Sequence, residues 1–355
     1  MTPIRVGIIG MQIDQSWAAI AHVPALREIA DYEISAVSTT RQESAEAAAA
    51  HYGIPQTFVG HQALVTSPDV DLVAVTVKVP AHFELVTAAI KAGKHVYCEW
   101  PLGNGLAEAQ QMAELARAHN VRAIVGLQAC VSPTISYVRD LVAEGYIGEV
   151  LSSSLIGTGI SWGGVIDARN GYTADQRNGA TLLSIPVGHT LDAVCSILGE
   201  FQQVSGVLAN GRTEATIQET GETIPMTAHD QVAVVGRTER GALVSAHYRG
   251  GLGPGTGLLW EIYGTKGTLQ ITGACGHAQL VDLSLACSHD PAEPLAPLVV
   301  PDSYYHTRLR EGTALNVAEM YYRFAKDIRE GTHSCPSFDH AVKRHEMLNA
   351  IEQGH

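Results

Sequence analysis

Several features that mark other classes of protein are scarce in this sequence of 355 residues. There is no run of about 18 apolar residues and no basic segment followed by an apolar run, so we expect neither a membrane span nor a secretory signal. The net charge of −13 argues against a nucleic-acid partner and is typical of a solvated acidic surface. The six cysteines never form C-x-x-C, which favours reduced thiols in a cytoplasmic protein.

Metal-binding patterns are also missing. The 16 histidines include no H-E-x-x-H motif and no cysteine–histidine spacing typical of zinc, so we expect no metal ion. The length exceeds that of one small core and indicates two domains. We predict a dinucleotide-binding domain over residues 1–128. A substrate-binding and oligomerisation domain follows over residues 129–355, with its last helices packing back on the first domain.

The first domain alternates apolar strands with helices, the pattern of a doubly wound parallel sheet in an α/β fold. The expected strands are Ile4–Ile9, Ile34–Ser38, Phe58–Val59, Leu72–Val77, His95–Cys98 and Ala123–Leu127. The expected helices are Trp17–Ala30, Gln42–Tyr52, Gln62–Thr66, His82–Ala92 and Leu106–Asn120.

In the second domain, short glycine turns join alternating strands into hairpins, which predicts a large, mostly antiparallel sheet with helices on one face. The expected strands are Val150–Gly157, Gln231–Arg237, Ala242–Tyr248, Leu258–Tyr263 and Thr268–Thr272. The expected helices are Thr134–Glu144, Val187–Leu198, Leu315–Glu330 and Asp339–Glu352.

The first strand leads into a turn that suits a dinucleotide. Ile4–Ile9 is followed by Gly10 and then by a helix, an arrangement that turns backbone N–H groups toward a pyrophosphate. Only the first glycine of the usual G-x-G-x-x-G remains, with Gln12 and Gln15 in the other places. We expect amides from Gly10 to Ser16 and the Ser16 hydroxyl to contact the pyrophosphate. Gln12 is either a cofactor ligand or a solvated loop residue.

The second strand ends in Ser38, Thr39, Thr40 and Arg41. A site that prefers NAD usually has an acid here for the ribose hydroxyls, and no acid is present. Hydroxyls and a guanidinium suit a 2′-phosphate, so we predict NADP as the preferred cofactor, with NAD as a second possibility. The alternative is that Arg41 is a solvent-exposed residue at the start of the following helix and does not bind the cofactor.

Five motifs follow one another in an order that resembles the glucose–fructose oxidoreductase/inositol dehydrogenase (Gfo/Idh/MocA) family over about residues 3–350. They are Pro80–His82, Ala92–Val96 with Glu99-Trp100-Pro101, Gly145–Val150, Gly188–Asp192 and Tyr263–Gly267. Within the family, the chain is most similar to the branch of the fungal galactose-regulon repressor and its bacterial relatives. That branch also has Trp in place of the family lysine and a degenerate glycine turn followed by Trp.

The resemblance implies oxidation of a sugar or polyol hydroxyl, with a lysine, an aspartate and a histidine sharing the proton transfer. The lysine position is Trp100 and the aspartate position is Ile185, so only His189 remains. Asp192 lies on the same helix face, where its carboxylate would fix the tautomer of the imidazole and raise its basicity. We predict His189 as the acid/base; the alternative is a structural histidine retained from an enzyme ancestor.

Two loop residues aligned with the repressor branch, Tyr172 and Asp175, are candidates to replace the lysine. A tyrosine with a lowered pKa could relay a proton, or it packs on a sugar ring or the core. Trp100 offers a flat face for nicotinamide or a pyranose, or fills the core. The expected cofactor site consists of Gly10, Met11, Gln12, Ser16, Trp17, Ser38, Thr39, Thr40, Arg41, Val77, Val79, His82, Glu99, Trp100, Pro101 and Gln128.

The leading interpretation is an NAD(P)-dependent oxidoreductase acting on a sugar, glycoside, polyol or related carbonyl compound. The alternative is a non-catalytic NAD(P)-binding regulator or sensor with a protein partner, because two catalytic positions are replaced; a purely structural subunit is a third. An open sheet face in the second domain predicts a homodimer or homotetramer. Substrate specificity is expected from the loops Gly157–Gly179 and Gly250–Gly257.

Overall fold

The computed structural model describes residues 2–255 and 257–354, which divide into two compact units. The first unit comprises Met1–Gln128 and Tyr305–Lys343, and the second comprises Ala129–Tyr304 and Arg344–His355. The division falls within helix α9 (Phe338–Gln353), so one continuous helix contributes residues to both units. Thr256, in the predicted loop Gly250–Gly257, lies outside the described residues.

The first unit contains the predicted parallel sheet, with six strands in the order β3-β2-β1-β4-β5-β6. All neighbouring strands are parallel. From β1 the strand order runs to one side through β2 and β3 and to the other side through β4, β5 and β6. Open α/β sheets bind their ligands at such a reversal of strand order. The strands are β1 (Ile4–Ile9), β2 (Tyr32–Thr39), β3 (Gln56–Val59), β4 (Leu72–Val75), β5 (His95–Glu99) and β6 (Ala123–Gly126).

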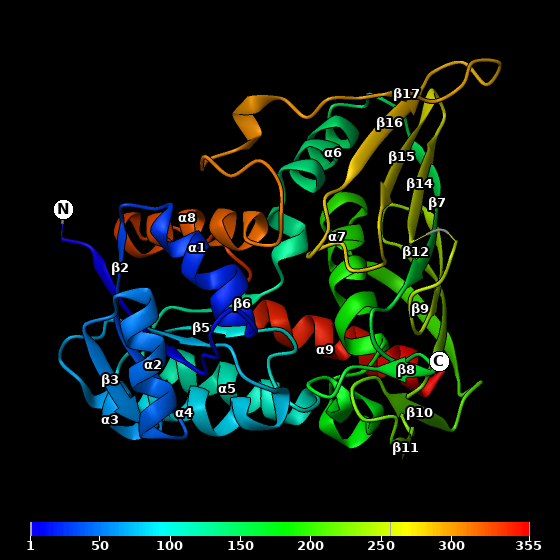
Figure 1. The fold of residues 1–355 in the computed structure, drawn as a ribbon. Helices are drawn as coiled ribbons and strands as arrows, with labels where there is room; N and C mark the ends of the chain where they lie inside the picture. The colour runs from blue at the N-terminus through cyan, green and yellow to red at the C-terminus, as the bar shows by residue number, and fades with distance from the viewer. Residues whose placement is uncertain (1, 256, 355) are drawn as a thin grey trace. The chain divides into compact units, whose positions relative to one another are not determined.

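Helices cover both faces of this sheet, and α1 and α8 lie side by side on one of them (Figure 1). This cover explains why strands such as β4 are buried along their whole length and read as continuous apolar runs. The helices are α1 (Val23–Arg27), α2 (Gln42–Tyr52), α3 (His61–Thr66), α4 (His82–Lys91), α5 (Leu106–Ala118) and α8 (Leu315–Glu330), with a short helix η2 (Val79–Ala81) before α4.

The helix expected over Trp17–Ala30 is shorter and irregular. It begins as a π-helix, η1 (Ala18–His22), and continues as α1, which ends at Arg27. Pro24 has no N–H to donate to the preceding turn, so regular α-helical hydrogen bonding cannot run through it. A π-helical turn widens the helix there, and such turns are frequent at functional sites.

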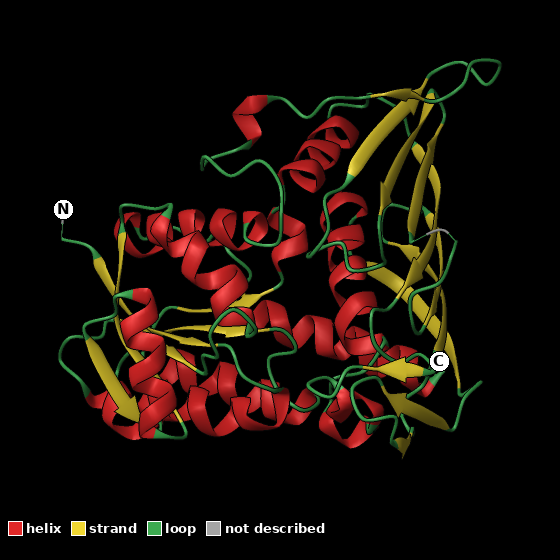
Figure 2. Ribbon diagram, in the orientation of Figure 1, coloured by secondary structure: helices red, strands yellow, loops and turns green. Residues whose placement is uncertain are grey.

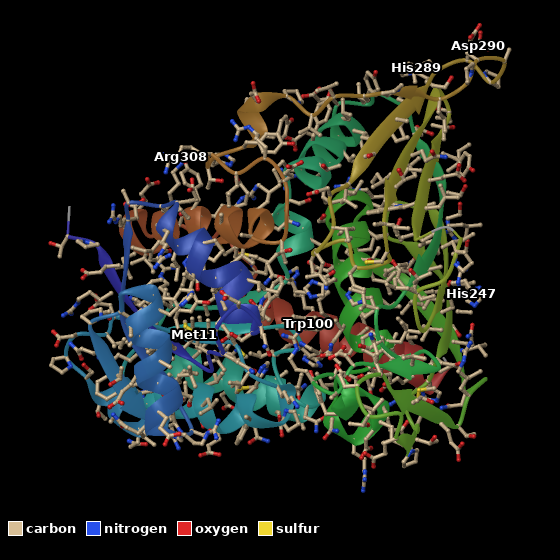
Figure 3. All side chains as sticks on the ribbon, in the orientation of Figure 1. Met11, Trp100, His247, His289, Asp290 and Arg308 are labelled. Carbon is tan, nitrogen blue, oxygen red and sulfur yellow. The ribbon has the colours of Figure 1, made fainter. Side chains whose placement is uncertain are left out.

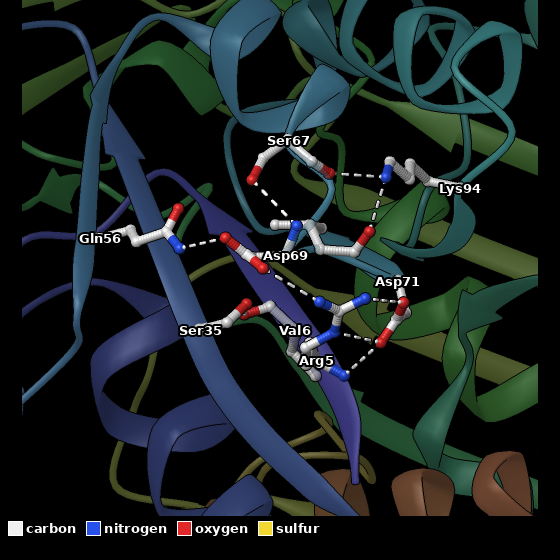
Figure 4. Close-up of polar contacts among 9 residues, drawn as sticks. Arg5, Val6, Ser35, Gln56, Ser67, Asp69, Asp71 and Lys94 are labelled. Atoms are coloured by element: carbon white, nitrogen blue, oxygen red, sulfur yellow. Dashed lines mark hydrogen bonds and ion pairs between the residues drawn. The ribbon is translucent and has the colours of Figure 1, made fainter. Parts of the chain in front are cut away.

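Charged groups tie together the amino ends of the strands in the first unit (Figure 4). From β1, Arg5 donates to both carboxylate oxygens of Asp71, at 2.9 Å from Nε and 2.7 Å from Nη2. Asp71 directly precedes β4. Lys94, directly before β5, donates to the backbone oxygens of Ser67 and Val70 at 2.7 and 2.6 Å. These contacts fix the starts of three neighbouring strands.

The second unit contains an eight-stranded sheet in the order β17-β16-β15-β14-β7-β13-β12-β9. The β7–β13 pair is parallel and the other neighbouring pairs are antiparallel, so the predicted fold class is confirmed. The strands are β7 (Val150–Thr158), β9 (Phe201–Ala209), β12 (Gln231–Thr238), β13 (Leu243–Arg249), β14 (Leu258–Gly264), β15 (Gly267–Gly273), β16 (Ser284–Ser288) and β17 (Ala296–Pro297).

Helices α6 (Pro133–Ala143) and α7 (Gly188–Leu198) lie on one face of this sheet, and among the described residues no helix of this unit is drawn on the other face (Figure 2). A second sheet of three strands, β8 (Val165–Ile166), β10 (Glu214–Ile217) and β11 (Thr223–Pro225), packs around a small core of its own. The sequence reading missed β8 to β11, β16 and β17, because these strands are short or lack a regular alternation of apolar residues.

Candidate functional site

The turn after β1 depends on Gly10. Its φ is +91°, and an added Cβ would lie 2.2 Å from Cγ1 of Val77. Its N–H donates to the backbone oxygen of Ser38, at the end of β2, at 2.9 Å. A side chain at Gly10 would therefore bring both backbone strain and a steric clash. The turn lies between β1 and β4, at the point where the sheet reverses its order.

Most amides of this turn are already used. Those of Gly10, Gln12, Asp14, Gln15 and Ser16 donate within the protein. The Ser16 hydroxyl accepts from the Gln12 N–H at 2.9 Å and donates to the Gln12 oxygen at 3.0 Å, so it closes its own turn instead of extending toward a cofactor as predicted. The Gln12 side chain donates to Gln15 at 2.9 Å. The predicted pyrophosphate contact is thus reduced to the amides of Met11 and Ile13.

The end of β2 separates the four predicted 2′-phosphate ligands into two pairs. The hydroxyl of Ser38 is buried and donates to the Gly60 oxygen at 2.6 Å. The hydroxyl of Thr39 bonds to the Arg41 oxygen at 2.8 Å and to Ser44 Oγ at 2.7 Å. Thr40 and Arg41 are exposed. Only these two side chains are oriented toward solvent and available to a phosphate.

His82, which is predicted to contact the cofactor, links two segments at this edge of the sheet. Its Nε2 lies 3.0 Å from the Val77 oxygen and its Nδ1 lies 2.9 Å from the Pro101 oxygen. Burial lowers the pKa of His82, although the surrounding carbonyls act in the opposite direction. The ring therefore connects the segment after β4 to the segment after β5.

A buried polar cluster surrounds Glu99 at the carboxyl end of β5. Nε2 of His22 lies 2.9 Å from Glu99 Oε1, and Nδ1 of the same ring lies 2.8 Å from the hydroxyl of Tyr321. Gln128 donates from Nε2 to both carboxylate oxygens at 2.8 Å and to the Tyr97 hydroxyl at 3.1 Å. His22 and Tyr321 are fully buried.

Two buried atoms near this edge lack a hydrogen-bond partner among the residues that the structure describes: Trp17 Nε1 and Gln128 Oε1. One is a donor and the other an acceptor. A Cβ at Gly126 would lie 2.8 Å from both Glu99 oxygens and from Gln128 Nε2, so the glycine leaves room for the cluster. Buried polar atoms without partners are rare in native proteins and call for an explanation.

The other predicted cofactor residues also lie in the first unit. Met11 and Trp100, labelled in Figure 3, are each 5% exposed. Val79 and Pro101 are buried and Val77 is partly buried. Trp100 directly follows Glu99, at the carboxyl end of β5.

In the second unit, His189 and Asp192 lie on α7, as predicted, but they do not form the expected pair. Oδ1 of Asp192 lies 3.4 Å from Nε of the fully buried Arg344, on α9. Nδ1 of His189 is buried without a hydrogen-bond partner among the described residues, so Asp192 does not hold the imidazole through that atom. Burial, together with nearby His277, lowers the pKa of His189 to about 3, although Asp192 opposes the shift.

His277 was not found from the sequence. It accepts a hydrogen bond at Nε2 from the Ile160 N–H at 3.1 Å, and its ring stacks on Trp162. Burial lowers its pKa to about 4. Nothing local distinguishes this histidine in the sequence, because Ile160 and Trp162 lie more than 100 residues away from it in the chain.

The loop candidates do not form a base. Burial raises the pKa of Tyr172, the reverse of the lowered value that a proton relay requires. Asp175 is held by the side chain and N–H of Arg177, which lower its pKa to about 2. The two loops expected to set specificity meet closely, since a Cβ on Gly163 would lie 2.7 Å from Cα of Gly251.

In the described part of the chain, no three His, Cys, Asp or Glu side chains are grouped as a metal site would require. No helix within residues 2–255 and 257–354 is long and apolar enough to span a membrane.

Comparisons with known proteins bear on both units. Residues 4–127 match the oxidoreductase family described by its NAD-binding Rossmann fold, and residues 133–273 match the Gal80p C-terminal domain. The chain is 40% identical to dehydrogenase aclE of Aspergillus oryzae over 206 residues, 56% of each protein. It is 29% identical to the galactose/lactose metabolism regulatory protein GAL80 of Kluyveromyces lactis, over 80% of this chain and 66% of that protein. These matches span less than two thirds of either relative.

Two solved structures share the fold. A super-repressor mutant of Gal80p from Saccharomyces cerevisiae has a TM-score of 0.89 at 23% identity, covering 99% of this chain and 96% of that one. Levoglucosan dehydrogenase, solved with NADH and levoglucosan, has a TM-score of 0.84 at 22% identity, covering 99% and 97%. At these identities the likeness establishes the fold alone.

Proposed function

Because residues 4–127 match the oxidoreductase family with an NAD-binding Rossmann fold and residues 133–273 match the Gal80p C-terminal domain, we propose that the chain is a cytoplasmic NAD(P)-dependent oxidoreductase of the Gfo/Idh/MocA family. Its substrate is a sugar, glycoside, polyol or related carbonyl compound. The first unit binds the cofactor and the second supplies an acid/base. The observation that carries the proposal is the pair of partnerless buried atoms, Trp17 Nε1 and Gln128 Oε1, at the carboxyl edge of a Rossmann sheet.

These two atoms fit a nicotinamide cofactor. A carboxamide has one oxygen to accept from Trp17 Nε1 and an NH2 group to donate to Gln128 Oε1. Gly10 leaves the close backbone approach that a pyrophosphate needs, and the amides of Met11 and Ile13 are available to it. When bound, the nicotinamide supplies the hydride chemistry. The protein has to hold it, orient the substrate and manage a proton.

In this proposal, His189 is the acid/base that accepts the proton of the substrate hydroxyl. Its imidazole is neutral near pH 7, because burial lowers its pKa to about 3. A neutral ring accepts a hydrogen bond from a hydroxyl and takes its proton as the hydride leaves. A charged imidazolium is disfavoured in this buried position, so the proton has to pass on to another group.

The test is cofactor reduction or oxidation across a panel of carbohydrates and ketones. His189→Ala should lower kcat/KM by about 100-fold or more, the usual contribution of a general acid/base. His119→Ala, which removes an exposed histidine at the end of α5, is the matched control. Full activity in His189→Ala would refute the assignment of the base.

A non-catalytic regulator is the second candidate. It is favoured by the match of residues 133–273 to the Gal80p C-terminal domain. The resemblance seen in the sequence also puts Trp100 and Ile185 where the family has Lys and Asp. Such a protein binds NAD(P) and a protein partner without turnover. A pull-down that retains a stoichiometric partner, together with no turnover on any substrate of the panel, would favour this candidate over the enzyme.

The helix-free face of the eight-stranded sheet is proposed to pair with another copy in a homodimer or homotetramer. The registers align Ile156, His247, Ala233 and Val207 in one row, and Val207 and Leu243 are 71% and 61% exposed. Leu243→Glu should yield monomers in light scattering. Leu252→Glu, on a loop and 62% exposed, is the matched control. A wild-type protein that is monomeric at micromolar concentration would contradict the proposal.

A further inference from the structure

We propose that Glu99 is a second proton-accepting residue of the reaction proposed above, and that His22 and Tyr321 position and polarise it. The inference rests on that proposed function. The lysine expected beside the substrate is replaced by Trp100, which cannot exchange a useful proton. Glu99 is its immediate neighbour and ends the same strand, at the edge where the reactive ring of a dinucleotide lies.

The hydrogen bonds around Glu99 have one consistent direction when its carboxylate is ionised. The Tyr321 hydroxyl donates to His22 Nδ1 over 2.8 Å, so the neutral ring carries its proton on Nε2 and donates it to Glu99 Oε1 over 2.9 Å. These two hydrogen bonds orient the His22 ring and hold the Glu99 carboxylate in place.

The environment of Glu99 is unusual for a purely structural carboxylate. Among the described residues, His22 is the only ion-pair partner of Glu99, and no lysine or arginine pairs with this carboxylate. The other titratable groups that interact with it are Tyr97, Tyr321, His82 and Cys98. Burying a carboxylate without a cation costs stability, and groups kept at such a cost are often functional.

Access and an open hydrogen-bonding position point to a ligand. The Glu99 side chain is 12% exposed, whereas His22 and Tyr321 are sealed from solvent, so the carboxylate is the open end of the chain. Beside it, Gln128 Oε1 is buried without a partner in the described structure. A donor supplied by a ligand would complete this cluster.

The proposed step is balanced as an alcohol oxidation. The substrate C–H bond breaks and its hydride goes to the oxidised nicotinamide, while the O–H bond breaks and its proton, which the buried His189 ring does not retain, ends on Glu99. A C=O bond forms, and Glu99 becomes a carboxylic acid. The substrate is oxidised, the cofactor is reduced, and Glu99 releases its proton on its solvent-exposed side.

Glu99→Gln tests the catalytic role, since the amide oxygen can still accept from His22. We expect kcat, measured at saturating cofactor, to fall by about 100-fold or more, and fluorescence titration separates this fall from any loss of cofactor affinity. Glu114→Gln removes an exposed carboxylate on α5 and is the matched control. A Glu99→Gln enzyme within tenfold of wild type would overturn the proposal.

Tyr321→Phe tests the positioning role and serves if Glu99→Gln fails to fold. It should shift the acid limb of the pH profile of kcat/KM by at least half a pH unit, because the chain loses the donor that orients His22. Tyr32→Phe is its control: the Tyr32 hydroxyl donates to the Tyr321 backbone oxygen at 2.9 Å, outside the chain. Equal profiles for the two variants would refute the positioning role of Tyr321. A wild-type protein that binds cofactor but turns over nothing would refute the proposed function itself.

Discussion

The two edges of the parallel sheet in the first unit differ in how their polar groups are satisfied. At the amino edge, Arg5 donates three hydrogen bonds to Asp71, one from its backbone N–H and two from its side chain, and Lys94 is held by two backbone oxygens (Figure 4). At the carboxyl edge, Trp17 Nε1 and Gln128 Oε1 are buried without partners among the described residues. Within the described residues, the charged groups of the amino edge pair with one another, whereas the carboxyl edge leaves a buried donor and a buried acceptor unpaired.

The difference has a physical cause. A protein gains stability by pairing its buried polar groups, and it loses stability when a buried group stays unpaired, by about 1–3 kcal/mol for each. Substitutions at the amino edge should therefore change stability and leave binding unchanged. Substitutions at the carboxyl edge should change binding more than stability.

The largest effect is expected at Gly10. Gly10→Ala should abolish detectable cofactor binding, with a loss of at least about 100-fold in affinity, and should lower the free energy of unfolding by about 2–4 kcal/mol through strain and overpacking. Gly53→Ala is the control, because Gly53 also has a positive φ, +64°, but no atom within 4 Å of an added Cβ. Fluorescence titration and urea unfolding measure both. Equal losses in the two variants would show that packing against Val77 does not matter.

Acidification should remove the stabilising contribution of His82 before that of Asp71. Burial lowers the pKa of His82 below the 6.5 of an unfolded histidine, so the unfolded state binds the proton first. The stability that neutral His82 contributes is complete above pH 6.5 and falls below it, by up to about 1.4 kcal/mol per pH unit. The Arg5 guanidinium lowers the pKa of Asp71 below 3.8, so the contribution of Asp71 is lost only at lower pH.

Urea unfolding of wild type, His82→Gln and Asp71→Asn at pH 7 and pH 5 separates these two effects. His189 and His277 act in the same direction as His82, because their pKa values are lowered to about 3 and about 4. The measurement is therefore the difference in slope between wild type and His82→Gln. If the free energy of unfolding changes equally between pH 7 and pH 5 in wild type and in His82→Gln, the assignment to His82 is wrong. A smaller change in Asp71→Asn than in wild type would also contradict it.

Arg41 should decide between the two dinucleotides. We predict that NADPH binds more tightly than NADH and that Arg41→Ala weakens NADPH by about 10-fold or more, because a guanidinium–phosphate contact is charge-assisted. The affinity for NADH should not change. Lys91→Ala, which removes an exposed cation on α4, controls for net charge. Equal affinities for both cofactors, with Arg41→Ala silent, would refute the preference.

The smallest effect is expected from Asp71→Asn at neutral pH. Both partners are partly exposed, at 34% for Arg5 and 38% for Asp71, so the pair contributes about 1 kcal/mol or less. Thermal unfolding should shift by a few degrees at most, and cofactor affinity should stay at the wild-type value. A change in cofactor affinity would contradict the separation between the two edges.

Much of the fold followed from local patterns. The apolar strands, the glycine turn and the hairpins are short-range signals, and helix α8 has the predicted bounds, Leu315–Glu330. The irregular start of the helix after Gly10 did not follow, because apolar periodicity does not distinguish a π-helix from an α-helix. Strands β8 to β11, β16 and β17 were not predicted either, because they are short or lack a regular alternation of apolar residues.

The amino-acid sequence by itself indicated a resemblance to the Gfo/Idh/MocA family, the fold class and the positions of Gly10, Glu99, Trp100 and His189, since each of these residues lies in a local motif. Only the tertiary structure decided which groups are paired. Asp192 pairs with Arg344 instead of His189. Glu99 bonds to His22, which lies 77 residues away in the sequence, and to Gln128, which lies 29 residues away. Such partners are brought together by long-range packing, which no local pattern of residues records.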